Sequence, residues 1–345
     1  MSYIYIVYKT EENVNSFKEG IFTMKSVFLC VATVMISVLL IPLGALKSET
    51  AVIKTSAKPE TAETLTVKKA AKVYESFKIL ISDSQKIETV SAKDYLFGCV
   101  ASEMPLSYSD EALKAQTVAA YTYACRKKQT SKNEYDLTDS PDTDQCYTPK
   151  ADLLKKWGLD AESNSKRLNE IIDSVYGRVL TYDGSLALTC YHAISSGKTE
   201  DCENVWGKKL PYLISVDSSY DKLSENYLTT LTVTADEVKE KLSGLKNAEG
   251  EAENWFSSPV TTDALTVKSI TFCNKTLTGF EVQKAFGLKS ACFEVSYFEG
   301  NFTFTVKGSG HGVGMSQNGA NYMAKQGSHF DEILLHYYPN CKIAE

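Results

Sequence analysis

One carboxylate, Glu103, has the sequence surroundings of a general acid. It lies within residues 91–128, which predict two helices broken at Pro105. Ser91 can cap the first helix, and Asp94 can return a capping bond three residues later. Apolar residues recur at spacings of three and four along one face, and Glu103 continues that face. Burial and the negative end of the helix dipole both favour the protonated carboxyl, so we expect a raised pKa and proton donation. The alternative is an ordinary glutamate that is solvated or paired with a lysine.

The second helix of this stretch is predicted to bury an alanine-rich face. Ser109 can cap it, and the acidic residues that follow suit a helix N-terminus. The shared face consists of Leu113, Thr117, Ala120, Tyr121 and Ala124. Small side chains let another backbone approach closely, and Gln116 is a polar residue near that contact. Gln116 and Tyr121 are candidate substrate-binding residues.

A second group of polar residues follows a predicted β-hairpin. The hairpin turns at Asp183-Gly184, and its second strand opens into a long polar loop. Loops at strand ends commonly present functional groups, so this loop is a candidate wall of a cleft, with Trp206 as a stacking surface. Its candidate substrate-binding residues are Tyr191, His192, Ser195, Ser196, Lys198 and Glu200. The alternative for His192 is a hydrogen-bonded structural role.

Glycines alternate along residues 308–314 near the C-terminus. Alternation strips side chains from one face of an extended segment and permits close approach of another backbone or of a flat ligand. Packing alone is the alternative. The run lacks both the lysine of a phosphate-binding loop and the spacing of a dinucleotide fingerprint. The polar residues that it can present to a substrate are His311, Ser316 and Gln317.

Composition limits the function classes. The chain has 345 residues, 43% hydrophobic and 23% charged, which fits one large or two medium globular domains. With a net charge of −6 it has no general basic field to attract nucleic acid, so nucleic-acid binding is not predicted. Its 20 tyrosines and 14 phenylalanines offer aromatic surface for stacking on sugars.

The nine cysteines predict neither a metal centre nor a disulfide framework. None forms a CxxC motif, and their number is odd. The set Cys190, His192, Glu200 and Cys202 has ligand chemistry but matches no standard zinc spacing, so no metal or other cofactor is predicted. Cys273 and Cys292 are the first pair to test for a bridge.

The N-terminal region predicts a membrane anchor. Residues 27–46 are almost uninterrupted apolar residues, long enough to span a bilayer, and we favour an uncleaved anchor over a signal peptide. Residues 1–26 are predicted to be a cytoplasmic N-terminus, although Met24-Lys25 resembles a second start site. Residues 47–70 read as a linker. Lysines flank the apolar run on both sides and do not decide its orientation.

Beyond the linker, helices and antiparallel strands fall in segregated runs. We expect one or two strands in 73–90, a strand in each of 213–216, 231–233 and 265–272, and a hairpin of 292–297 with 301–306. Helices are expected at 168–176, 235–242, 278–286, 315–325 and 330–338. Because no regular βαβ alternation occurs, the fold class is α+β.

Three motifs resemble, in family order, those of the stage II sporulation protein D family. They are the run SEMPLSYSDEALKAQTVAAYTYA, the segment from Tyr191 to Ser218, and the signature from Gly308 to Pro339. The resemblance covers roughly residues 73–343. It departs from the family at Ser196, where Gly is usual, and at Tyr121, where Arg is usual. Some clostridial members bind zinc near the position of Cys146, but here no His is nearby, and that zinc is not carried over.

The resemblance implies a membrane-anchored lytic transglycosylase of endospore-forming bacteria, with Glu103 as its catalytic acid. Residues 71–345 would form an extracytoplasmic, two-lobed body around a substrate groove, on the mother-cell membrane facing the forespore. The substrate would be peptidoglycan glycan strands stripped of peptides, cut between MurNAc and GlcNAc to 1,6-anhydro ends during engulfment. The implied partners are stage II sporulation proteins P, an amidase, and M.

Two other functions compete with this one. One is a non-catalytic glycan-binding scaffold of the engulfment complex, to which the loss of the family Arg at Tyr121 lends weight. The other is a cell-wall peptidase or amidase with Cys190 or Cys99 as nucleophile and His192 or His311 as base.

Overall fold

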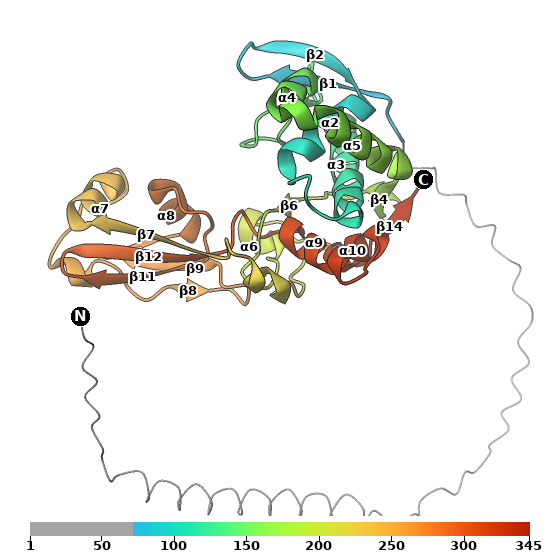
Figure 1. Ribbon diagram of the computed structural model, residues 1–345. Coiled ribbons are helices and arrows are strands. Elements are labelled where there is room, and N and C mark those ends of the chain that lie inside the picture. The colour runs from blue at the N-terminus through green and yellow to red at the C-terminus, as the bar shows by residue number, and fades with distance from the viewer. Residues whose placement is uncertain (1–71) are drawn as a thin grey trace, which may run out of the picture. The chain divides into compact units, whose positions relative to one another are not determined.

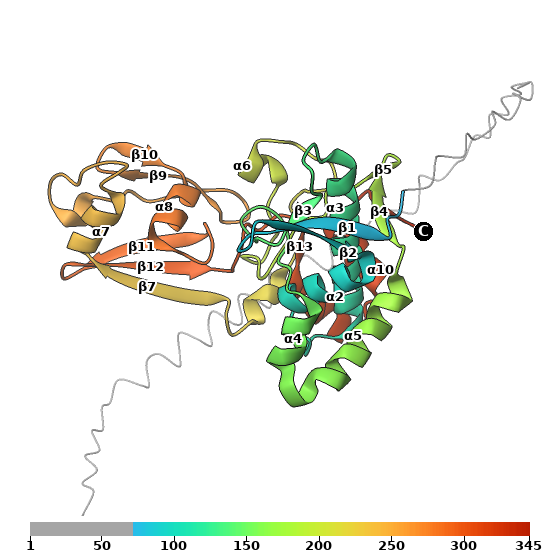
Figure 2. The same cartoon turned by 90° about the horizontal axis from the view of Figure 1, so that it is seen from above.

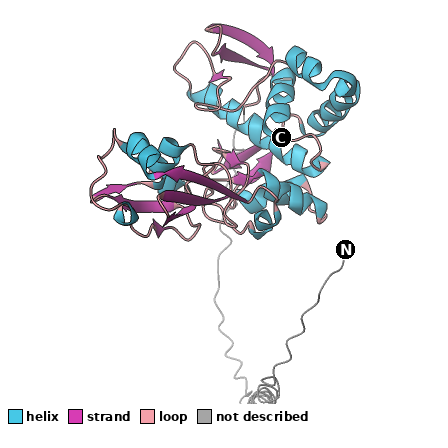
Figure 3. Ribbon diagram, turned by 60° about the vertical axis from the view of Figure 1, so that its left-hand side comes forward, coloured by secondary structure: helices cyan, strands magenta, loops and turns pink. Residues whose placement is uncertain are grey.

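The computed structural model describes residues 72–345. The predicted N-terminus, anchor and linker (1–70) therefore lie outside the described residues. Within the described part of the chain, no helix combines the length and apolar character needed to cross a membrane. Helices and small, mostly antiparallel sheets make up this part of the chain, so the α+β class is confirmed (Figures 1 and 3).

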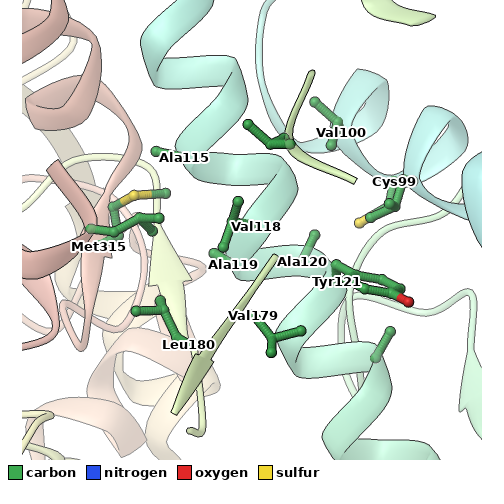
Figure 4. Close-up of a cluster of buried hydrophobic side chains, with 14 of the residues drawn as sticks. Cys99, Val100, Ala115, Val118, Ala119, Ala120, Tyr121, Val179, Leu180 and Met315 are labelled. Atoms are coloured by element: carbon green, nitrogen blue, oxygen red, sulfur yellow. The ribbon is translucent and has the colours of Figure 1, made fainter. Parts of the chain in front are cut away.

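The first of two hydrophobic cores surrounds the helix α3 (Asp110–Thr130), and we call it the large lobe. Alanines let neighbouring segments approach α3 closely, and Figure 4 shows Ala115 and Ala119 facing Met315 and Leu180. The other helices of this lobe are α2 (Ala92–Glu103), α4 (Lys150–Trp157), α5 (Ala161–Val175), α6 (Cys202–Trp206), α9 (Gln317–Lys325) and α10 (Phe330–Tyr337). Its strands are β1 (Ser76–Ile81), β2 (Lys86–Ser91), β3 (Leu137–Thr138), β4 (Val179–Tyr182), β5 (Ser185–Leu186), β6 (Tyr191–His192), β13 (Met315–Ser316) and β14 (Lys342–Ala344).

The second core belongs to residues 228–307, which we call the small lobe. Two three-stranded antiparallel sheets, β11-β12-β7 and β10-β9-β8, carry the helices α7 and α8 (Figures 1 and 2). The bounds are β7 (Leu228–Thr234), α7 (Ala235–Leu242), β8 (Val260–Thr261), β9 (Val267–Phe272), β10 (Lys275–Leu277), α8 (Gly279–Phe286), β11 (Phe293–Phe298) and β12 (Asn301–Lys307). The core between them is aromatic, with Phe304 packed on Phe286 and Phe293.

Local capping signals mark several element ends where the sequence predicts them. Ser91 caps α2 by accepting the Asp94 N–H. Thr278 and its partner three residues on form a capping box at the start of α8, which ends at the left-handed Gly287. Ser109 occupies the N-cap position of α3, but its side chain makes no capping hydrogen bond, so that detail of the prediction is wrong.

Three further expectations are corrected. Residues 213–216 form no strand; their backbone bonds instead to the 199–202 segment, as where the Ser215 N–H donates to the Asp201 carboxylate. The helix predicted at 168–176 is longer, and α4 before it was missed. Cys273 and Cys292 are both free thiols, as are the other cysteines of the described residues; the Cys273 sulfur donates to the Glu249 carbonyl, and the Cys292 sulfur lies 3.5 Å from the Thr266 hydroxyl.

Candidate active site

Glu103 is the last residue of α2 and is partly buried. The Cys146 backbone N–H donates to its Oε1 at 2.7 Å. Burial raises the pKa of the carboxyl, and the Cys146 N–H, the nearby Tyr191 hydroxyl and the nearby Gln317 amide each offset part of that rise. The raised pKa agrees with the direction predicted from the sequence.

The segment that supplies the Cys146 N–H is held against α2 by close packing. A Cβ at Gly98 would lie 2.6 Å from the Tyr147 ring, so only glycine lets the segment approach. Ser102 donates to the Thr148 hydroxyl at 2.9 Å from the same face of the helix. The neighbouring Gln145 amide donates to Tyr95 and to a carbonyl of α3. The position of the amide beside Glu103 is therefore fixed by two helices.

Tyr191 extends this network from β6. Its hydroxyl donates to Gln145 Oε1 at 2.8 Å and lies 3.8 Å from the Cys99 sulfur. Burial, together with the negative charge of Cys99 and Glu103 when these are ionised, raises the pKa of Tyr191 well above its usual value. Tyr191 is thus a neutral hydroxyl at any working pH.

Val313 sets the protonation of two histidines. Its N–H donates to Nδ1 of His311 at 3.0 Å, so His311 carries its proton on Nε2. Its carbonyl lies 3.2 Å from Nδ1 of His192, which must be the donor there. Burial lowers the pKa of His192 to about 4, and burial together with the nearby His192 ring lowers the pKa of His311 to about 3. Both imidazoles are therefore neutral.

The alternating glycines allow backbone to pack on backbone. All four have positive φ, and a Cβ at Gly308 would lie 2.6 Å from the Ile194 carbonyl oxygen. A Cβ at Gly314 would overlap the Cys190 carbonyl. The partner is the 190–200 loop, which bridges to this run at several residues. The packing alternative therefore accounts for the glycines without a flat ligand.

A cavity of about 1120 Å³ lies against Glu103 and is lined by both lobes. The large lobe contributes Glu103, Tyr123, residues 141–146 and 189–191, Asn204, Val205, Trp206 and His311. The small lobe contributes Thr262, Thr266, Val267, Lys268, Thr278, Phe280 and Gln283. Trp206 is 47% exposed at this wall, with its ring 5.0 Å from that of His311.

The cavity brings together only some of the predicted site residues. Glu103, Tyr191 and His311 line it, and Gln317 lies near the acid. Lys198 is exposed outside it, and Glu200 is buried where it accepts bonds from Asn204 and Thr262. No sequence motif predicts the small-lobe wall of the cavity.

The prediction is corrected for the remaining substrate-binding candidates, because these residues are buried and do not line the cavity. The Tyr121 hydroxyl donates to the Tyr74 carbonyl at 2.9 Å, inside the core. The backbone N–H of Ser195 and the hydroxyl of Ser316 instead donate hydrogen bonds to the buried Asp221 carboxylate. The other members of this group are Gln116, His192 and Ser196. Gln116 and His192 Nε2 have no hydrogen-bond partner within the described residues.

No three potential metal-ligating side chains gather at one point within residues 72–345.

Comparison with known proteins gives a consistent result. A family model described as "Stage II sporulation protein" matches residues 81–182. Stage II sporulation protein D of Bacillus subtilis (strain 168) is 36% identical over 88% of this chain and 87% of its own length. Stage II sporulation protein D of Bacillus amyloliquefaciens is 34% identical over 92% and 94%. The amidase enhancer of Bacillus subtilis (strain 168) is 29% identical over 71% of this chain and 39% of its own length.

Proposed function

The chain belongs to the stage II sporulation protein D family, and from this premise we propose that it is a peptidoglycan lytic transglycosylase with Glu103 as its single catalytic residue. Membership assigns the chain to sporulation. The proposal that the chain cleaves glycan goes beyond what family membership alone states. One observation carries it: a carboxyl with a raised pKa stands at the wall of a cavity large enough for several sugar rings.

The reaction uses one carboxyl twice. Protonated Glu103 gives its proton to the glycosidic oxygen as the bond from MurNAc C1 to that oxygen breaks, and GlcNAc leaves with a hydroxyl. The Glu103 carboxylate then takes the proton of the MurNAc 6-hydroxyl as its oxygen bonds to C1. The product has a 1,6-anhydro end, Glu103 is protonated again, and no water is consumed. Ordinary glycosidases need two carboxylates at a set distance, which this scheme does not.

The surroundings of Glu103 suit both halves of that cycle. Burial raises the pKa of the carboxyl and so favours the protonated form that the first step requires. The Cys146 N–H then stabilises the carboxylate that the first step leaves. Trp206 offers an exposed aromatic face on which a sugar ring can stack.

The cysteine peptidase alternative is disfavoured by the same geometry. Burial raises the pKa of the Cys190 thiol to about 12 and raises that of Cys99 well above its usual value, so neither is a thiolate. His192 and His311 each use Nδ1 in a bond with Val313 and have lowered pKa values, so neither is poised as a base. The scaffold alternative also loses support, since Tyr121 lies in the core and away from the cavity.

The setting of the activity is part of the proposal. We infer a single-pass anchor at 27–46 and a catalytic region outside the cytoplasm, on the mother-cell membrane facing the forespore. The substrate would be glycan already stripped of its peptides, with stage II sporulation proteins P and M as partners in engulfment.

The test is digestion of amidase-treated peptidoglycan by the full-length chain, with products identified by mass spectrometry. Wild type should release anhydro-MurNAc ends, and Glu103→Gln should lose about 10²-fold to 10⁴-fold in rate. Glu170→Gln, an exposed acid on α5, is the matched control and should keep full activity. Binding of glycan without any anhydro ends would support the scaffold instead. Release of peptide fragments from intact glycan would support the peptidase.

A further inference from the structure

The cavity beside Glu103 has an uneven distribution of charge. Within the described residues, Lys268 is the only lysine or arginine that lines it. Lys268 belongs to β9 of the small lobe and is exposed. No acidic side chain of the described residues stands within ion-pair distance of it, so its ammonium group is available to a ligand. The histidine at the opposite wall, His311, is neutral, with its pKa lowered to about 3.

The acids of the cavity stand on the large-lobe wall. Asp144 is buried and paired with Lys127 at 2.6 Å, which neutralises it. Asp142 is exposed in the same loop. The large-lobe wall therefore repels an anionic substrate group or does not interact with it, whereas the Lys268 ammonium attracts it.

The helix α8 does not compete for that anion. Thr278 and Phe280 of its N-terminal end line the cavity, but the capping box formed by Thr278 and Glu281 already fills the helix end with a carboxylate. This leaves the Lys268 ammonium as the group that can recognise a negative charge on the small-lobe wall.

Each MurNAc residue of peptidoglycan carries one group that can be an anion. MurNAc carries a lactyl ether that ends in a carboxyl group. When a peptide is attached, this carboxyl is an amide and has no charge. When the peptide has been removed, it is a free carboxylate.

We propose that Lys268 binds the free lactyl carboxylate of MurNAc and so selects glycan strands that have lost their peptides. This assignment rests on the proposed function. It also fixes how the strand lies: the lactyl group faces the small lobe while the glycosidic oxygen faces Glu103 on the large lobe. A peptide-bearing MurNAc loses the ionic contact and brings a bulky substituent to the same wall.

The expected effect is about tenfold in affinity, as for a hydrogen bond to a charged group in a site partly open to solvent. Raising the ionic strength should reduce it, because salt screens a partly exposed pair.

The experiment compares two glycans with two variants of the full-length chain in detergent. The glycans are peptide-stripped strands with free lactyl carboxylates and the same strands with those carboxylates converted to neutral methylamides. The variants are Lys268→Met and, as matched control, Lys284→Met, an exposed lysine of α8 that does not line the cavity. Equilibrium binding and release of anhydro ends are both measured, and thermal melting checks that each variant is folded.

Wild type and Lys284→Met should bind the carboxylate strands about tenfold more tightly than the methylamide strands, and Lys268→Met should bind both alike. If Lys268→Met keeps the preference, or if wild type has none, the assignment is overturned. Binding that depends on Lys268 without any cleavage would retain this assignment and refute the transglycosylase. Cleavage by wild type without a Lys268-dependent preference would do the reverse.

Discussion

The substitution Gly98→Ala tests whether the packing of one loop against α2 positions the acid. In an open helix this change stabilises by about 1 kcal/mol, since alanine is the better helix former. Here the added Cβ would lie 2.6 Å from the Tyr147 ring and would also overlap the Thr148 carbonyl. Ordinary carbon contacts begin near 3.5 Å, so the loop must retreat by about 1 Å.

We expect the overpacking to cost about 3 kcal/mol and the net loss of stability to be about 2 kcal/mol. For a domain of this size, that lowers the melting temperature by about 4–8 °C. The retreat also carries the Cys146 N–H away from its 2.7 Å bond with Glu103. A misplacement of about 1 Å at a reacting group can cost about 10²-fold in rate.

Calorimetry and the release of anhydro ends measure the two effects separately. Gly244→Ala is the control, because no atom lies within 4 Å of the Cβ that it adds. A Gly98→Ala protein that melts higher than wild type and cleaves glycan normally would refute the reasoning, since the loop would then move freely without affecting the acid.

Three other predictions concern Glu103, Tyr121 and Asp221. Because the pKa of the Glu103 carboxyl is raised in the folded protein, the folded state holds a proton that the unfolded chain releases. The buried carboxyl therefore destabilises the folded state, and this effect grows as pH rises from the unfolded pKa to the folded one. Glu103→Gln should accordingly melt above wild type at neutral pH and lose that advantage near pH 4, as calorimetry across pH will report. Tyr121→Phe should cost about 1 kcal/mol in denaturant unfolding, through the lost bond to the Tyr74 backbone, and leave the cleavage rate unchanged. Asp221→Ala should cost about 3 kcal/mol in the same unfolding assay, because four donors lose this buried carboxylate as their acceptor; wild-type stability in this variant would contradict that network.

Local signals in the sequence were sufficient for the elements that frame the acid. Ser91 and Pro105 bound α2 because a cap and a helix breaker act within one turn. The capping box at Thr234 marks the start of α7 for the same reason. Residues 213–216 have the apolar pattern of a strand, yet they make only scattered backbone bonds to residues 199–202, and the side chains of Thr199 and Asp201 accept two of their N–H groups.

The cavity could be predicted only in part. Glu103 and Tyr191 stand in motifs whose residue types suggest chemistry, and His311 lies within the run of alternating glycines. Tyr121 shares a helix face with the core, and that pattern predicts its burial better than a contact with substrate. Lys268 has no local feature that distinguishes it from other surface lysines; only the folded chain shows that it lines the same cavity as Glu103.

In the proposed mechanism, the same carboxyl must first donate a proton and then accept one, and the contacts of Glu103 are compatible with both steps. If burial acted alone, the pKa would rise so far that the acid could not release its proton to the leaving oxygen. If the donors acted alone, the carboxylate would be too stable to take a proton back from the 6-hydroxyl. Here burial raises the pKa, while the Cys146 N–H, the Tyr191 hydroxyl and the Gln317 amide lower it. The Cys146 N–H donates to the carboxylate directly, whereas Tyr191 and Gln317 are polar neighbours from two other segments, which the alternating glycines bring together. In the proposed mechanism, the close packing of the 190–200 loop on residues 308–314 is therefore a condition for an acid that also serves as the base.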